Sequence, residues 1–147
     1  QFAGIREPLV AVLQRRYGTQ ANKPYLRISI APPGLTDMKS RVIAAMGANA
    51  LESIAFNSGI KRANGLFGIY NFHGGTSRYA TLMTHWLARA PAGAILMCHP
   101  ADEVGLGDEI GVARAQEFAF LASDQFAAAL QTTGVTIARG QTTLPAS

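Results

Sequence analysis

The chain has 147 residues, of which 48% are hydrophobic and 15% are charged, a balance that excludes an intrinsically disordered protein and allows one buried core. Its formal net charge is +4, but the basic side chains are scattered along the sequence and form no dense run. Because a nucleic-acid-binding module would show a basic stripe or a pattern of stacking aromatic residues, we predict no nucleic-acid partner.

The first third of the chain predicts one helix and one strand. Apolar residues recur at helical spacing over residues 5–17, with Pro8 early and Gly18 just beyond the end, which indicates a helix. Residues 25–30 alternate in polarity, and the Pro-Pro-Gly sequence that follows forbids regular structure. We therefore expect a strand over 25–30, with Arg27 inside it.

A second helix and a second strand follow. Thr36 or Asp37 can cap this helix at its start, and it should run to about Ser58. Gly47 is a weak point along it, because glycine disfavours a helix interior. The next predicted strand covers residues 65–70.

The second half of the chain continues the alternation. Thr76 or Ser77 can cap a third helix, which ends before Pro91. Residues 93–98 form a short, strongly apolar run. Such a run is typical of a strand that is covered on both faces, as in parallel sheets.

The last predicted elements are a loop, a long helix and a strand. Glycine and acidic residues dominate the loop 100–111, and large apolar side chains fall on or near one face of a helix over 112–132. Gly134 ends this helix, and residues 135–138 form the last strand. We expect residues 141–147 to fray.

The predicted order alternates helix and strand four times along the chain. This order implies right-handed crossovers and either a parallel sheet or a segment of a β/α barrel. The fold class is therefore α/β. Because no interdomain linker interrupts the pattern, we predict one domain over residues 1–140.

The expected location follows from weaker signals. No apolar stretch reaches the about 18 residues that a membrane span needs, and the start of the chain lacks the pattern of a secretory signal. The single cysteine, Cys98, excludes an intramolecular disulfide and a cysteine-based zinc site. We therefore predict a cytoplasmic protein without a membrane span.

Candidate catalytic residues follow the ends of the predicted strands, where parallel α/β folds place their active face. His99 comes directly after the strand 93–98. Imidazole suits general acid–base catalysis near neutral pH, although a structural histidine before a proline turn fits this position equally well. For His73, in the loop after the second strand, a flexible His-Gly-Gly turn is the more ordinary interpretation.

Charged residues elsewhere are weaker candidates. Arg27 could orient a carboxylate or form a salt bridge at a sheet edge, because burial of an unpaired charge is costly. The acidic residues of the loop 100–111 could bind a metal, but they more often form a solvated lead-in to a helix. Arg114 and Glu117 are three residues apart and could pair at the start of the fourth helix.

Several segments around the third strand and the following helix resemble one known family: Leu96–Pro100, Asp108, 114–117 and 121–123. They are similar to the YdjC family of carbohydrate deacetylases, and so are residues 64–70 and 134–137. The resemblance covers most of the chain and is closest to the branch associated with hopanoid biosynthesis. Ile95 is a departure, because many relatives carry a glutamate there.

The resemblance implies a distorted β/α barrel of the NodB deacetylase type, in which a divalent metal, Mg or Zn, is bound by an aspartate and two histidines. The metal would polarise the acetyl carbonyl of an N-acetylated sugar or glycolipid, and a histidine would protonate the leaving amine. His99 would be that acid, and Arg27 would orient the base. Asn71, His73 and Pro100 are the predicted substrate-binding residues.

The metal-binding residues of that family belong to its N-terminal half and have no counterpart in this sequence. We therefore expect this chain to be the C-terminal half of such a barrel and to bind no metal by itself. It should form a homo-oligomer or pair with an N-terminal half, because an incomplete barrel leaves open sheet edges and apolar surface. The alternative is a non-catalytic α/β interaction domain that keeps only the framework.

Overall fold

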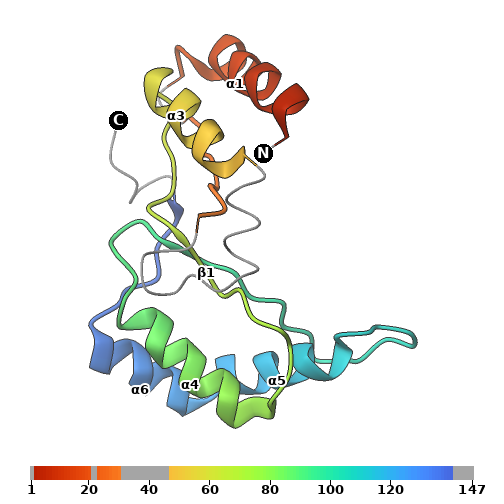
Figure 1. The fold of residues 1–147 in the computed structure, drawn as a ribbon. Helices are drawn as coiled ribbons and strands as arrows, with labels where there is room; N and C mark the ends of the chain where they lie inside the picture. Colours follow the sequence, from red (N-terminus) through yellow and green to blue (C-terminus); the bar gives the residue numbers. More distant parts are fainter. Residues whose placement is uncertain (1, 21–22, 31–46, 141–147) are drawn as a thin grey trace. The chain divides into compact units, whose positions relative to one another are not determined.

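The computed structural model describes residues 2–20, 23–30 and 47–140, and the chain divides into two compact units. Unit 1 consists of Gln1–Phe67, Pro91–Ile95 and Ala138–Ser147, and unit 2 consists of Gly68–Ala90 and Leu96–Ile137. Figure 1 shows their helices and strands. The mixture of helices and parallel strands confirms the α/β class, whereas the single domain and the barrel of NodB type stay predictions.

Helices α1 and α3 build the core of unit 1. α1 covers Ala3–Tyr17, which confirms the predicted helix, and α3 covers Asn49–Asn57. Gly47, just before α3, has a φ of +108°, which an α-helix does not allow, so the regular α-helix begins after it. The predicted caps Thr36 and Asp37 lie outside the described residues. One apolar cluster joins the two helices to neighbouring segments: Val10, Leu26, Ile28, Ala48, Leu51, Ala55 and Ile60.

The predicted strand over 25–30 is reduced to an isolated bridge. Leu26 forms a parallel bridge with Arg62, and the backbone N–H of Leu66 donates to the carbonyl of Ile30 at 3.2 Å. The segment thus runs alongside the chain that leads into the first strand. It does not form a regular strand, because a ladder needs regularly repeated backbone bonds and these two positions are four residues apart.

A parallel sheet of two short strands replaces the longer strands that were predicted over 65–70 and 93–98. β1 covers Leu66–Phe67 and β2 covers Ile95–Leu96. β1 ends at Gly68, whose φ of +87° lies in the left-handed region and is incompatible with a strand. The predicted strands therefore exist but are shorter.

Gly68→Ala should lower the free energy of unfolding by more than about 2 kcal/mol, because it combines backbone strain with a clash. A Cβ at this position would lie 2.1 Å from the backbone oxygen of Met97. Gly134→Ala is the matched control, since Gly134 has a φ of +67° but no atom within 4 Å of the added Cβ. The control should cost about 1 kcal/mol in urea unfolding. Equal losses for the two variants would contradict the tight approach to Met97.

Three helices pack together in unit 2. α4 covers Gly75–Leu87, α5 covers Gly111–Leu121 and α6 covers Asp124–Thr133. Each contacts the other two, and Figure 1 shows them side by side. Large buried side chains between them form an aromatic-rich core: Tyr79, Met83, Trp86, Leu87 and Phe120.

Two predictions about these helices are wrong. Gly74, in the left-handed region at φ +97°, caps α4, so the predicted caps Thr76 and Ser77 lie inside the helix. The predicted helix over 112–132 is broken between α5 and α6. Ser123 adopts the extended conformation (φ −95°, ψ 157°) and its Oγ donates to the carbonyl of Phe120 at 2.6 Å. Ser123 therefore occupies the N-cap position of α6 without a side-chain capping hydrogen bond, and its extended backbone interrupts the preceding helix.

The predicted strand over 135–138 is also wrong. The N–H of Gly134 donates to the carbonyl of Gln131, and the N–H of Val135 donates to that of Leu130. These two bonds form a Schellman motif, so Val135 completes the end of α6 and does not begin a strand. In the part of the chain that the structure describes, no helix is both long and apolar enough to cross a membrane.

Candidate functional site

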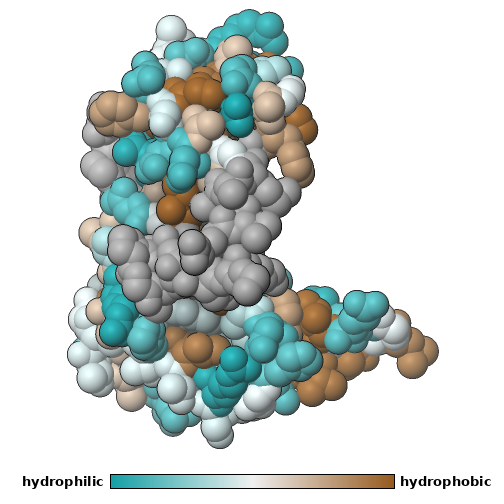
Figure 2. All heavy atoms as spheres, viewed as in Figure 1, coloured by the Kyte–Doolittle hydropathy of each residue, from teal (hydrophilic) through white to brown (hydrophobic). Residues whose placement is uncertain are grey.

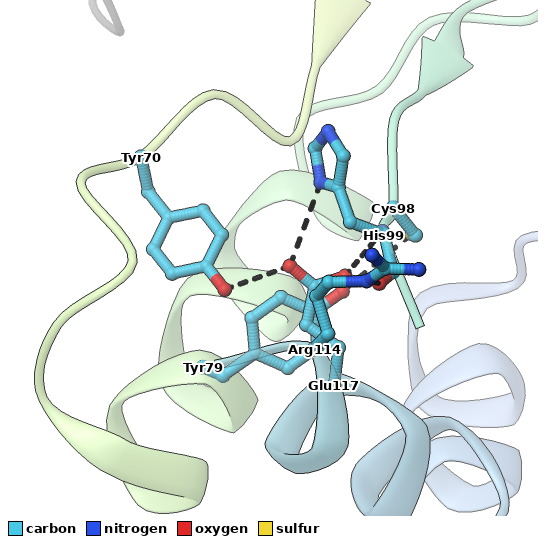
Figure 3. A network of polar contacts seen from close by, with 6 residues as sticks. All are labelled: Tyr70, Tyr79, Cys98, His99, Arg114 and Glu117. Carbon is cyan, nitrogen blue, oxygen red and sulfur yellow. Dashed lines mark hydrogen bonds and ion pairs between the residues drawn. The ribbon is translucent and has the colours of Figure 1, made fainter. Parts of the chain in front are cut away.

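A buried carboxylate at the centre of unit 2 joins three parts of the chain. Glu117 of α5 has no solvent-exposed surface. Its Oε1 accepts a hydrogen bond from the Tyr70 hydroxyl at 2.7 Å, and its Oε2 accepts one from the backbone N–H of His99 at 2.5 Å. Figure 3 shows how Tyr70 and His99 approach the carboxylate. The carboxylate thus connects the segments that follow β1 and β2 to α5.

The His99 ring is fixed in orientation. Its Nδ1 lies 3.7 Å from Oε1 of Glu117, is buried, and has no hydrogen-bond partner among the described residues. The ring packs edge-on against Phe72, with 5.2 Å between centroids. Nε2, on the opposite edge, points away from the carboxylate (Figure 3), and the side chain keeps 30% of its surface exposed. Nε2 is therefore the nitrogen available for chemistry.

A second set of contacts holds the backbone of His99 from the other side. The Nε of Arg114 donates to the carbonyl of His99 at 3.1 Å, and its Nη1 donates to Oδ2 of Asp108 at 3.0 Å. Asp108 also accepts the backbone N–H of Ile110 at 3.1 Å. Both backbone groups of His99 are thus tied to charged side chains, and such hydrogen bonds are stronger than neutral ones.

These contacts correct two predictions. Arg114 and Glu117 do not pair with each other, because Glu117 is buried inside the unit whereas Arg114 extends to His99 and Asp108. Asp108 is not simply part of a solvated lead-in, since it is half-buried and paired. Its loop neighbours Asp102 and Glu103 are exposed, as that interpretation expects.

Burial and the Glu117 charge also raise the pKa values of the Tyr70 hydroxyl and the Cys98 thiol. Burial raises the pKa of the Tyr70 hydroxyl, and the hydrogen bond to Glu117 raises it further. Burial likewise raises the pKa of the Cys98 thiol, which lies 3.5 Å from the Tyr79 hydroxyl. Tyr70 therefore remains a hydrogen-bond donor at neutral pH, and Cys98 is a neutral thiol without nucleophilic character.

Tyr70→Phe should reduce the loss of stability at alkaline pH. Because the pKa of Tyr70 is raised on folding, its stabilising contribution is complete below the unfolded value of about 10 and is lost as pH rises above it. The wild-type free energy of unfolding should therefore fall as pH rises above about 10, and the variant should fall less steeply. Urea titrations at several pH values measure both slopes. Parallel slopes would contradict the raised pKa.

The predicted substrate residues Asn71 and His73 lie together in the lining of one pocket of about 420 Å³. Arg78 fixes their loop, because its Nη1 donates to Oδ1 of Asn71 and to the carbonyl of His73, both at 2.8 Å. Pro100 is exposed next to His99 and is not part of this lining. That these residues bind substrate stays a prediction.

Arg27 belongs to unit 1, where it is exposed, whereas His99 belongs to unit 2. The predicted role of Arg27 in orienting a base stays a prediction. The two other histidines have other neighbours: His73 lines the pocket, and Nδ1 of His85 lies 3.1 Å from Nη1 of Arg89.

The described residues do not fit the metal site that the family resemblance implies. Over residues 2–20, 23–30 and 47–140, no three His, Cys, Asp or Glu side chains are grouped so that they could hold a metal ion. Three or more such ligands are the usual minimum for a catalytic metal. We therefore derive no catalytic step through a metal.

The role of Glu117 was not predicted, although its position in α5 carries a signal. Ala113, Glu117 and Phe120 are all buried on α5, at the i, i+4 and i+7 positions of one face. A glutamate at a core position of an amphipathic helix must find partners, because an unpaired buried charge is very costly. A glutamate on the apolar face of this helix is therefore expected to have buried partners, and Glu117 is such a residue.

A histidine and a buried carboxylate beside short parallel strands form an arrangement that suits general acid–base chemistry in an α/β protein. Compared with protein families, the chain matches the family described as YdjC-like protein over residues 1–132. The chain therefore belongs to the YdjC-like family, which is related to carbohydrate deacetylases and supports a hydrolase-type function. Comparisons with curated proteins and with solved structures find no match.

Proposed function

We propose that the protein acts in the hydrolytic removal of N-acetyl groups from a sugar or glycolipid, and that His99 protonates the leaving amine. One observation carries this proposal: Glu117 accepts a hydrogen bond from the backbone N–H of His99 and lies 3.7 Å from its Nδ1, so that Nε2 points away from the carboxylate. Membership of a family related to carbohydrate deacetylases supports the choice of reaction.

The proposed reaction uses one water molecule. A base takes one proton from this water as the water oxygen bonds to the acetyl carbon, and that proton later returns to His99. The carbon–nitrogen bond breaks, and the electron pair of this bond stays on the sugar nitrogen. The proton on Nε2 of His99 moves to that nitrogen, so the products are acetate and an amino sugar. Glu117 is a positioning residue, because it touches His99 and not the reacting atoms. Protonation matters here because an amine anion is a very poor leaving group.

The family resemblance adds a divalent metal, Mg or Zn, to this proposal, with Arg27 orienting the base. The metal would activate the water and polarise the carbonyl when bound. Because the described residues hold no group of three ligands, its ligands would come from elsewhere, as from an N-terminal half of the barrel. A link to hopanoid biosynthesis stays a prediction.

We also propose that the complete enzyme is a homo-oligomer or pairs with an N-terminal half. Apolar side chains are exposed in and next to the loop before α5, where Val104, Leu106 and Val112 are 51%, 108% and 67% exposed. Figure 2 shows brown, apolar surface on this loop beside teal, hydrophilic residues. Such a surface supports a contact that covers it. Light scattering of the purified protein tests this, and a monomer at all concentrations would contradict the homo-oligomer.

Acetate release tests the proposed function. The natural protein at its full length should release acetate from N,N′-diacetylchitobiose when Zn²⁺ or Mg²⁺ is supplied. The product mixture should gain one free amine for each acetate, which a ninhydrin assay measures. If no acetate is released from N-acetylated oligosaccharides or glycolipids with either metal, the deacetylase proposal fails and the non-catalytic interaction domain becomes the better explanation.

A further inference from the structure

Phe72 has a backbone conformation that is rare for a residue with a side chain. Its φ is +60°, and every other positive φ among the described residues belongs to a glycine. This left-handed conformation brings the Cβ of an L-residue close to the following carbonyl oxygen, so it costs free energy. Such strain persists only where the surrounding contacts enforce it, and it is concentrated at functional sites. Contacts of the neighbouring residues and of the ring must therefore hold Phe72 in place.

Arg78, in the first turn of α4, enforces this conformation from the backbone side. Its Nη1 donates to Oδ1 of Asn71 and to the carbonyl of His73, both at 2.8 Å. These two acceptors belong to the residues on either side of Phe72, so one guanidinium bridges the turn. The stem of Arg78 packs against the same turn, because a Cβ at Gly74 would clash with its Cδ.

The Phe72 ring packs against two groups of the candidate site. Its centroid lies 5.2 Å from that of the His99 ring, and the two ring planes are 78° apart. It lies 4.8 Å from the centroid of Tyr70, whose hydroxyl donates to Glu117. Tilted and edge-on aromatic pairs at such distances are favourable contacts. Phe72 thus connects the imidazole of His99 to the aromatic residue that binds the buried carboxylate.

The imidazole of His99 needs such a contact, because the carboxylate does not hold it by a hydrogen bond. Oε1 of Glu117 lies 3.7 Å from Nδ1, which is too long for a hydrogen bond, and Nδ1 has no hydrogen-bond partner among the described residues. Glu117 and Arg114 hold the backbone N–H and carbonyl of His99, but these bonds leave the side-chain torsions free. Packing against Phe72 restricts the rotation of the ring.

We propose that Phe72 is a positioning residue that holds the imidazole of His99 in the direction from which it protonates the leaving amine, and that Arg78 keeps Phe72 in this place. The inference rests on the proposed function and adds two residues to its proton-transfer step. The proton still moves from Nε2 to the amine nitrogen, and no bond to Phe72 or Arg78 forms or breaks. A proton donor must lie within hydrogen-bond reach of its acceptor, and a misplacement of about 1 Å can cost roughly 100-fold in rate.

Phe72→Asn removes the ring and keeps the turn, since asparagine adopts the left-handed conformation more readily than most residues with a side chain. On N,N′-diacetylchitobiose with Zn²⁺, the full-length variant should lose about tenfold or more in kcat. On p-nitrophenyl acetate, whose leaving group needs no acid, the loss should stay below about threefold. Phe72→Tyr keeps the ring and should stay within about twofold of the wild type on both substrates. Phe118→Asn, at a side chain of α5 that is 44% exposed, is the matched control and should leave kcat unchanged.

Arg78→Ala is a second test, which also decides the matter if circular dichroism shows Phe72→Asn to be unfolded. It keeps the ring in the chain but removes the bridge that fixes it, so kcat on chitobiose should fall by about fivefold or more. In the Phe72→Asn background, Arg78→Ala should lower kcat by less than about twofold, because both residues act on His99 through one contact. Losses that multiply would show that Arg78 does not act through Phe72.

NMR of the His99 imidazole tests the positioning role without turnover. In ¹⁵N-labelled full-length protein, the ring signals of His99 are those that disappear in His99→Ala. The wild type and Phe118→Asn should give one sharp set of these signals. In Phe72→Asn and Arg78→Ala the set should shift or broaden, because the ring exchanges between orientations.

Three outcomes overturn the role of Phe72: wild-type kcat of Phe72→Asn on chitobiose, equal losses on the two substrates, or His99 signals that do not change in the variant. The proposed function fails separately, when the wild type releases no acetate. An enzyme that releases acetate in a His99-dependent way, but whose His99 signals and kcat are independent of Phe72, keeps its proposed function and loses this positioning residue.

Discussion

His99→Ala should slow acetate release by about 100-fold or more, because general acid catalysis contributes roughly 10²–10⁴-fold. The loss should appear in kcat, since the proton moves only in the transition state. KM should stay within about twofold, because Arg78 still fixes Asn71 and the carbonyl of His73 in the variant. Initial rates over a range of substrate concentrations at one pH measure both constants.

His85→Ala is the matched control for this variant. His85 is exposed on α4, where its ring lies next to Arg89, and it is not part of the pocket lining. Its removal should leave kcat unchanged. The role of His99 would be contradicted by a His99→Ala enzyme with wild-type kcat, or by equal losses in the two variants.

Glu117→Ala should lower the free energy of unfolding by about 3 kcal/mol or more. The change leaves the Tyr70 hydroxyl and the His99 N–H without their acceptor in a buried place, and each unpaired group costs about 1–3 kcal/mol. The empty volume left by the side chain adds to this cost. Urea unfolding followed by circular dichroism gives the difference.

Glu117→Gln separates the positioning role from folding. Glutamine keeps the volume and one acceptor, so it should fold with a smaller loss, about 1–2 kcal/mol. Its kcat should fall while KM stays constant, because His99 is displaced and the pocket is not. Glu103→Gln, on the exposed loop, should change stability by less than about 0.5 kcal/mol. If Glu117→Ala were as stable as Glu103→Gln, the carboxylate would not hold this site together.

The sequence predicted the helices well where residues close together in the chain determine their limits. α1 follows the predicted segment, and α4 starts close to the predicted position because Gly74 and Gly75 precede an amphipathic stretch. The strands were too long, because their limits depend on tertiary contacts such as the close approach of Gly68 to Met97. No local pattern reports such a contact.

The same difference applies to the candidate site. The positions of its residues after the strands were predicted, whereas their contacts with distant segments were not. The strand-end rule led to His99 and to the Asn71–His73 loop, and the structure places all three in unit 2. Their spacing of three residues predicted a pair between Arg114 and Glu117. In the structure Arg114 contacts Asp108, whereas Glu117 accepts hydrogen bonds from Tyr70 and His99, so both find their partners in other segments. Those partners are 6 to 47 residues away along the chain.

The dependence of the His99→Ala rate on the leaving group tests the proton-donor role most directly. An amine must be protonated to leave, whereas p-nitrophenolate leaves as an anion and needs no acid. His99→Ala should therefore lose about 100-fold or more on N,N′-diacetylchitobiose but only a few-fold on p-nitrophenyl acetate. An equal loss on both substrates would show that His99 does not protonate the leaving amine.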